Sequence, residues 1–197
     1  KFNAMNQKIQ ELIEENYKII IMKKEAEIKA LNLQLDPHFM YNTLNTISLQ
    51  LIRNGQEETS ELIISLSKIL KYSLRTNDDV VPFTQDLDYT KSYIHIMSSR
   101  FEGKFVVDYS IDPRLYEYKV PKFFLQPFVE NALIHGFKQL VRQGILKISC
   151  WIENDSRVYC VEDNGVGMSR EKVKEILDAK QSSIGINNVR NRIKIIY

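Results

Sequence analysis

The N-terminal part of the chain repeats apolar side chains in alternate steps of three and four residues. The repeat runs from Phe2 to Leu33 and is broken only by Asn16 and Lys23. Such a heptad is typical of a coiled-coil seam, in which polar residues at position a fix the register and the number of strands. We therefore predict that residues 1–34 form a parallel, dimeric coiled coil. The alternative is a single amphipathic helix that packs on its own domain.

The apolar pattern continues through Pro37 but changes phase. A proline inside a helix costs about 3 kcal/mol or more, so we expect a kink there, with His38 turned away from the apolar side. The sequence RNG at residues 53–55 predicts a turn, and a second helix should follow over about residues 57–75. Two helices per chain, doubled by the coiled coil, make a dimeric four-helix bundle over residues 35–78.

Residues 79–197 mix the periods of strands and helices. Strand patterns cover residues 105–111, 145–152 and 157–163. Helices are expected to begin at Thr84, as a capping residue, and at Pro121, as a first-turn proline. Two further helices are expected over residues 169–177 and 186–197. This interleaving predicts a two-layer α/β sandwich, so that the chain as a whole is α+β.

Composition limits the kinds of function that the chain can have. The 197 residues carry a formal charge of +2, which is too small to favour nucleic-acid binding. Cys150 and Cys160 form no CxxC pair and have no clustered histidines beside them, so reduced thiols are a better interpretation than a metal site. The apolar runs of the sequence are too short to cross a bilayer.

Three polar clusters stand where apolar residues would be expected. They are QPFVENALIHGF at residues 126–137, VEDNGVGM at 161–168 and SSIGINNV at 182–189. Glycines at a turn or a helix N-terminus let backbone N–H groups approach a phosphate. A carboxylate at a strand end can accept a hydrogen bond from an adenine amino group, and an amide oxygen suits Mg²⁺. Each cluster alone is a weak signal, but the three in this order predict a nucleotide site.

Together with PHFMYNTLN at residues 37–45, these clusters resemble the motifs of the LytS/YesM-like sensor histidine kinases. PHFMYN resembles the phosphoacceptor box of that family, and LQPFVENALIHG, DNGVGM and IGINNVRNRI resemble the boxes of its Bergerat-type ATP-binding domain, here residues 79–197. The resemblance implies that His38 is phosphorylated, that Asn131 holds Mg²⁺ and that Asp163 contacts adenine. It also implies that four further residues lie at the nucleotide, namely Gly165, Gly167, Gly185 and Asn188.

Several polar residues keep alternative interpretations. Asn42, on the His38 side of its helix, would place a water for dephosphorylation or be a plain surface residue. His135 would contact the nucleotide phosphates or interact with a helix dipole. Glu130 matches the same box as Asn131 and is a catalytic candidate by that resemblance. His95 lies off the apolar stripe of its helix and is expected to be solvated.

The resemblance implies ATP-dependent autophosphorylation in a homodimer, with ATP and Mg²⁺, and then transfer to an aspartate of a response regulator. It implies the cytoplasmic portion of a bacterial membrane sensor, whose membrane segments lie outside this sequence. The alternatives are a Bergerat-type ATPase without a phosphohistidine and a degenerate kinase that serves only as a dimeric scaffold. The sequence departs from the family pattern at Ser183, where a glycine is usual, in the short segment from Met168 to Ser183, and in lacking closing strands after residue 197.

Overall fold

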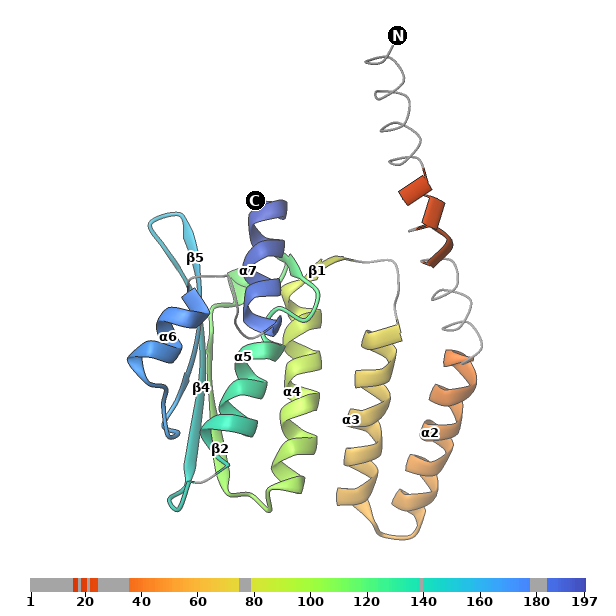
Figure 1. Ribbon diagram of the computed structural model, residues 1–197. Coiled ribbons are helices and arrows are strands. Elements are labelled where there is room, and N and C mark those ends of the chain that lie inside the picture. The colour runs from red at the N-terminus through yellow and green to blue at the C-terminus, as the bar shows by residue number, and fades with distance from the viewer. Residues whose placement is uncertain are drawn as a thin grey trace. The chain divides into compact units, whose positions relative to one another are not determined.

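The computed structural model describes residues 16–17, 19–20, 22–24, 36–74, 79–138, 140–177 and 184–197 (Figure 1). The chain divides into two compact units, residues 1–43 and 44–197. In the first unit the described residues between 16 and 24 are helical and exposed. Most of the predicted coiled coil lies outside the described residues, so it stays a prediction.

A helical hairpin is built from α2 (Pro37–Arg53) and α3 (Glu57–Leu74). The predicted turn between them is confirmed, because Gly55 has a φ of 73°, which glycine adopts without a steric penalty. Near the turn the buried hydroxyl oxygens of Ser48 and Ser60 lie 2.8 Å apart. Helix α2 begins at Pro37, where a missing N–H costs nothing. The expected helix upstream of Pro37 falls on residues 25–35, outside the described residues.

Three strands form the main sheet, in the order β2 (Phe105–Ile111), β4 (Gly144–Glu153) and β5 (Ser156–Asp163). β2 and β4 are parallel, whereas β4 and β5 form an antiparallel hairpin. All three strands were predicted, and β2 has the predicted bounds. In β4 the buried Leu146, Ile148 and Cys150 alternate with more exposed residues, so one face of the sheet belongs to the core.

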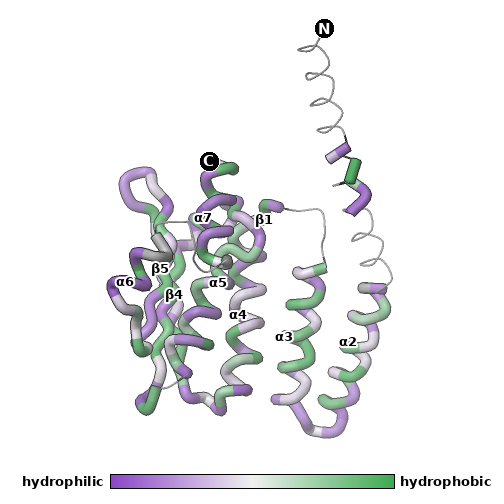
Figure 2. Tube along the Cα trace, viewed as in Figure 1, coloured by the Kyte–Doolittle hydropathy of each residue, from purple (hydrophilic) through white to green (hydrophobic). Residues whose placement is uncertain are grey.

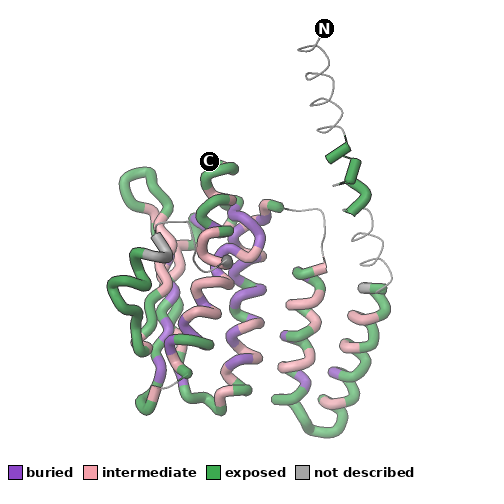
Figure 3. Tube along the Cα trace, viewed as in Figure 1, coloured by how far each residue is buried: buried purple, intermediate pink, exposed green. Residues whose placement is uncertain are grey.

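Helices cover that apolar face. α4 (Phe83–Arg100), α5 (Gln126–Glu130) and α7 (Ile184–Ile196) lie on the same side of the sheet (Figure 1). Figure 3 shows buried residues along most of α4, interspersed with half-buried ones. The largest buried side chains include Phe83, Leu87, Leu115, Leu125, Leu133, Leu146 and Ile148. The chain is therefore α+β, as predicted, with helices packed on a mixed sheet.

Two short strands, β1 (Val80–Pro82) and β3 (Lys119–Pro121), pair antiparallel and were not predicted. Two predicted helix starts are wrong. α4 begins at Phe83 rather than at a capping Thr84, and no side chain caps it. Pro121 ends β3, and the next helix begins at Gln126. The second error has a clear cause, because the pairing of β1 with β3 holds Pro121 in an extended conformation.

The hairpin keeps more of its apolar surface exposed than the sheet layer does. Figure 2 shows apolar residues along both α2 and α3, whereas Figure 3 shows most of the hairpin as exposed or half-buried. Five exposed side chains have between 37% and 59% of their surface accessible: Ile47, Leu49, Ile52, Ile64 and Leu66. An exposed apolar surface of this kind is typical of a protein–protein contact.

Candidate functional site

Two of the three polar clusters meet at one cavity. Its volume is about 280 Å³, close to the lower end of the range of about 300–1,000 Å³ for small-molecule sites. The lining residues come from the helix after α5, from the loop after β5 and from α6 (Arg170–Leu177), and they are Asn131, His135, Gly136, Asp163, Gly167, Met168 and Lys172. The structure thus brings together four of the residues predicted from the sequence, which are Asn131, His135, Asp163 and Gly167.

Asn131 and His135 lie on a π-helical turn. The turn covers Asn131–Gly136 and continues directly from α5. π-helical turns are rare and occur often at functional sites, because the wider turn redirects side chains that a regular helix would place elsewhere. Asn131 is half-buried and His135 is exposed, so both side chains are within reach of a ligand in the cavity.

The loop after β5 is held tightly against this helix. Gly165 N donates to Asp163 Oδ1 at 2.8 Å, and Val166 N donates to the carbonyl oxygen of Gly136 at 3.1 Å. A Cβ atom at Gly165 would lie only 2.6 Å from the Cα and carbonyl oxygen of Gly136. Glycine at position 165 is therefore required by this close approach of two backbones. Gly167, at φ 71°, needs glycine for its backbone conformation instead.

Asn164 fastens the same loop to the sheet, a role that the sequence analysis missed. Its Oδ1 accepts from the backbone N–H of Ile145 at 2.7 Å, and its Nδ2 donates to the carbonyl oxygen of Gln143 at 3.1 Å. Arg142 also donates to the carbonyl oxygen of Asn164. These bonds continue the β4–β5 pairing past Asp163 and fix the position of its carboxylate. Gly136, Met168 and Lys172 were also missed as lining residues.

Gly165 itself does not line the cavity, and neither do the predicted residues Glu130, Gly185 and Asn188. Glu130 accepts a hydrogen bond from Gln126 Nε2 at 2.7 Å. Burial raises the pKa of Tyr93 to about 12, and the electrostatic effect of Glu130 adds to this rise. A Cβ at Gly185 would lie 3.1 Å from Pro127, so Gly185 lets α7 approach α5. Asn188 is exposed on α7.

His38 is presented at the start of α2, in the other unit. The Asp36 carboxylate accepts from the backbone N–H groups of His38 and Phe39 at 3.0 and 3.2 Å, as an N-terminal cap does. One turn later, Asn42 Nδ2 lies 3.2 Å from His38 Nδ1. An amide can donate to or accept from a neutral imidazole, so Asn42 can orient the exposed ring and select its tautomer.

His95 was expected to be solvated, and 41% of its side-chain surface is accessible, but it also has partners that were not predicted. Its Nδ1 lies 2.8 Å from Ser65 Oγ, and its Nε2 lies 3.9 Å from the carboxylate of Glu61. Both partners belong to α3, which packs against α4. The helix pattern around His95 carries no information about this distant segment, and the side chain is half-buried as a result.

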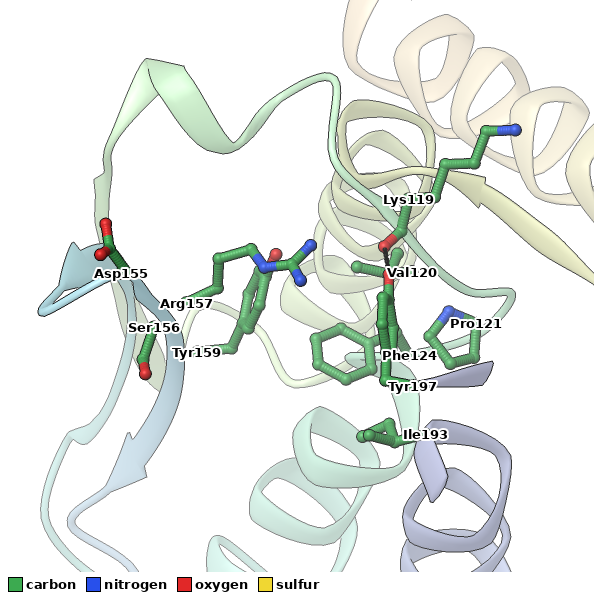
Figure 4. A pocket seen from close by; sticks show the side chains of 10 residues that line it. All are labelled: Lys119, Val120, Pro121, Phe124, Asp155, Ser156, Arg157, Tyr159, Ile193 and Tyr197. Atoms are coloured by element: carbon green, nitrogen blue, oxygen red, sulfur yellow. Dashed lines mark hydrogen bonds between the residues drawn. The ribbon is translucent and has the colours of Figure 1, made fainter. Parts of the chain in front are cut away.

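A larger cavity of about 390 Å³ contains none of the predicted site residues (Figure 4). Arg157 lies on its wall, with the guanidinium 4.7 Å from the ring centre of Tyr118 and 5.1 Å from that of Tyr197. Tyr197 in turn donates to the carbonyl oxygen of Lys119. Because the guanidinium of Arg157 already packs on two aromatic rings, we assign this wall to stabilising the fold. We therefore place the candidate functional site at the smaller cavity.

The residues at that cavity fit a magnesium–nucleotide complex. Within the described ranges, no cluster of three or more His, Cys, Asp or Glu side chains could hold a metal ion by itself. Mg²⁺ that bridges phosphates needs only one or two protein oxygens, since waters and phosphate oxygens complete its octahedron. The amide oxygen of Asn131 can supply such a ligand. The cationic Lys172 suits the phosphates.

Comparison with known proteins agrees with these motifs. A family model described as histidine kinase matches residues 26–105. The chain is 33% identical over its whole length to the sensor histidine kinase YesM of Bacillus subtilis, of which it covers 33%. It is 38% identical over 78% of its length to the sensor protein LytS of Bacillus subtilis, of which it covers 26%, and 36% identical over 89% to the sensor histidine kinase YpdA of Escherichia coli, of which it covers 31%.

The chain thus spans about a third of the length of these relatives, or less. In the part of the chain that the structure describes, no helix is both long enough and apolar enough to cross a membrane. The phosphoacceptor-like box falls inside the matched residues 26–105, and the alignments with the relatives extend over most or all of the chain. The chain belongs to the histidine kinase family, among the sensor kinases of the YesM and LytS type.

Proposed function

We propose that the protein is an ATP-dependent histidine kinase that phosphorylates His38 and then passes the phosphoryl group to an aspartate of a response regulator. The observation that carries the proposal is the convergence of Asn131, His135, Asp163 and Gly167 on one cavity, in a chain that also presents an exposed, capped histidine at the start of a helix. The family membership supports the same reaction.

In this proposal different cavity residues contact different parts of the nucleotide. Asp163 uses the oxygen that is not bonded to Gly165 to accept a hydrogen bond from the adenine amino group. Asn131 holds Mg²⁺, which supplies charge neutralisation for the phosphates. Lys172 and His135, on the same wall, add N–H donors for the phosphate oxygens. Gly185 and Asn188 lie outside this cavity, and their proposed contacts are with the part of the ligand that extends toward α7.

His38 supplies the nucleophile. An imidazole near neutral pH has one unprotonated nitrogen, which attacks the γ-phosphorus, forms an N–P bond and displaces ADP. Catalysis of phosphoryl transfer depends mainly on positioning and on stabilising charge. Asn42 contacts the ring and so holds it for attack. In the same proposal Asn42 positions a water that hydrolyses the N–P bond and releases inorganic phosphate. Glu130, the residue before Asn131 in the chain, is the candidate general base.

The direct test is incubation with Mg²⁺ and ATP labelled at the γ-phosphate. We expect incorporation of label that is lost in acid and kept in base, as a phosphoramidate requires, and that maps to the peptide containing His38. Hydrolysis of ATP without labelled protein would instead support a Bergerat-type ATPase. Absence of both ATP binding and label would support a degenerate kinase that acts as a scaffold.

Asp163→Asn should weaken ATP binding about a hundredfold. The asparagine oxygen can still accept from Gly165 N, so the loop keeps its shape. The new NH₂ group then faces the adenine amino group, and a lost hydrogen bond to a charged acceptor costs about 1.5–3 kcal/mol. Titration calorimetry measures the effect. Asp155→Asn, at the exposed β4–β5 turn, is the matched control and should bind ATP as the wild type does.

We further propose that α2 and α3 pair with those of a second copy in a four-helix bundle. The exposed apolar residues of the hairpin support this arrangement. Leu66→Glu should raise the dimer dissociation constant at least tenfold, because burying one leucine contributes about 1.5–3 kcal/mol. Analytical ultracentrifugation reads the result. Lys68→Glu, an exposed charge change on the same helix, should leave the dimer intact, and an unchanged Leu66→Glu dimer would contradict the bundle.

The partners and location follow from the same proposal. The relatives are named as sensors, so we propose that this chain is the cytoplasmic portion of a bacterial membrane sensor, with its membrane segments outside residues 1–197. Its partners are a second copy, ATP and a response regulator, and we propose no nucleic-acid partner.

A further inference from the structure

One carboxylate lies completely inside the protein, away from the cavity. Asp86, on α4, has no exposed surface. Its Oδ1 accepts from the hydroxyl of Tyr72 at 2.7 Å and from the backbone N–H of Phe124 at 3.0 Å, and its Oδ2 accepts from the backbone N–H of Leu125 at 3.0 Å. Burial raises the pKa of Asp86, and these hydrogen bonds oppose the rise. Burying a carboxyl group without hydrogen-bond partners costs free energy, so these three donors stabilise its buried position.

Two of these donors belong to the start of α5. Leu125 is the residue at the N-terminal end of this helix, and no side chain nearby in the sequence caps it. The first N–H groups of a helix need partners from elsewhere. Asp86 provides them from α4, with one carboxylate oxygen for Phe124 and the other for Leu125. Phe123, the residue before Phe124, has a φ of 61°, a strained conformation for a non-glycine residue that its surroundings must hold in place.

We propose that Asp86 is a positioning residue for the nucleotide site. It acts through the start of α5, which continues into the π-helical turn, and so sets the place of Asn131 at the cavity. The distance along the helix from Leu125 to Asn131 is about 9 Å at 1.5 Å per residue. A small rotation at the helix start therefore moves the Asn131 amide away from its ligand position. This inference rests on the proposed nucleotide binding at that cavity.

Elements on either side hold the same segment. Lys122 Nζ donates to the carbonyl oxygen of Ser73 at the end of α3, and Arg192 of α7 donates to the carbonyl oxygen of Lys122 at 2.7 Å. The Tyr72 ring also packs against Phe123, with ring centres 5.3 Å apart. Residues 122–125 thus form a junction where α3, α4 and α7 meet the start of α5, and Asp86 accepts from two of its backbone N–H groups.

The test compares four variants for Mg²⁺–ATP affinity and for amide exchange without nucleotide. Asp86→Asn keeps the size of the side chain but turns an NH₂ group toward an N–H donor. We expect about a tenfold weaker ATP affinity, and loss of exchange protection at Phe124 and Leu125. Leu87→Ala, next in the chain and buried, should lower the melting temperature at least as far but change ATP affinity less than threefold. Tyr72→Phe should weaken binding two- to threefold, and Tyr89→Phe not at all.

Wild-type ATP affinity in Asp86→Asn would overturn the proposal, as would an equal loss in Leu87→Ala. If Asp86→Asn does not fold, amide exchange in the wild-type protein tests the proposed cap. Its Phe124 and Leu125 amides should exchange at least a hundredfold more slowly than unprotected amides, and fast exchange at both positions would reject the cap. Failure of the wild type to bind ATP would instead reject the proposed function, and the exchange measurement would still report on the cap.

Discussion

His38→Ala is expected to abolish incorporation of the γ-phosphate while leaving ATP binding unchanged. The histidine is exposed and lies outside the cavity residues, so its removal takes away the phosphoryl acceptor and nothing that holds the nucleotide. Removing a group that forms the covalent bond leaves no alternative route to the same product. Labelling with γ-labelled ATP measures the acceptor, and calorimetry measures the site.

The matched control is His95→Gln. His95 contacts Ser65 and Glu61 within the α3–α4 contact, so its replacement tests whether loss of any imidazole reduces labelling. We expect full labelling of this variant. If His38→Ala were labelled as strongly as the wild type, another residue would be the phosphoryl acceptor, and the assignment of His38 would be wrong.

Gly165→Ala is expected to remove measurable ATP binding and to destabilise the domain. A methyl group at this position would meet the backbone of Gly136 at 2.6 Å and the Asp163 carboxylate at the same distance. Backbone atoms cannot move aside as a flexible side chain can, and an overpacked site typically costs about 1–3 kcal/mol. Relief of the clash requires the loop to leave the helix, which separates Asp163 from Asn131 and His135. Calorimetry and thermal unfolding measure the two effects.

Gly103→Ala provides the comparison. Gly103 has a φ of 68°, but nothing lies within 4 Å of an added Cβ. It therefore carries the backbone strain of a left-handed alanine, about 1–2 kcal/mol, without a clash. This variant should lose some stability and bind ATP normally. Equal ATP affinity in both variants would mean that the contact between the loop and the helix does not shape the site.

Local patterns predicted much of this fold. The alternation of Phe105–Ile111 gave the exact bounds of a strand, and a glycine after a helical run marked the hairpin turn. Strands of three residues, such as Val80–Pro82, carry too little alternation to be recognised. The partner of Val80–Pro82 lies about forty residues further along the chain, and this long-range pairing also explains why no helix begins at Pro121.

The residues that line the candidate cavity were predicted where a motif names them, and were missed where only the three-dimensional arrangement brings them there. Asn131 and Asp163 belong to motifs, and both line the cavity. Asp86 resembles an ordinary charged residue of an amphipathic helix, and only the fold reveals that it is buried. Asn164 could have been suspected, since an asparagine between a strand end and a glycine often bonds to nearby backbone.

The parallel pairing of β2 with β4 has a consequence for energetics. Parallel neighbours need a connection that crosses back over the sheet, and here α5 and its π-helical turn belong to that connection. Opening the seam between these two strands would release Asn131 as well. A ligand that binds only the closed form stabilises it by about 2.7 kcal/mol at a hundred times its dissociation constant. In the proposed function ATP is such a ligand, and its binding would then also stabilise the pairing of β2 with β4.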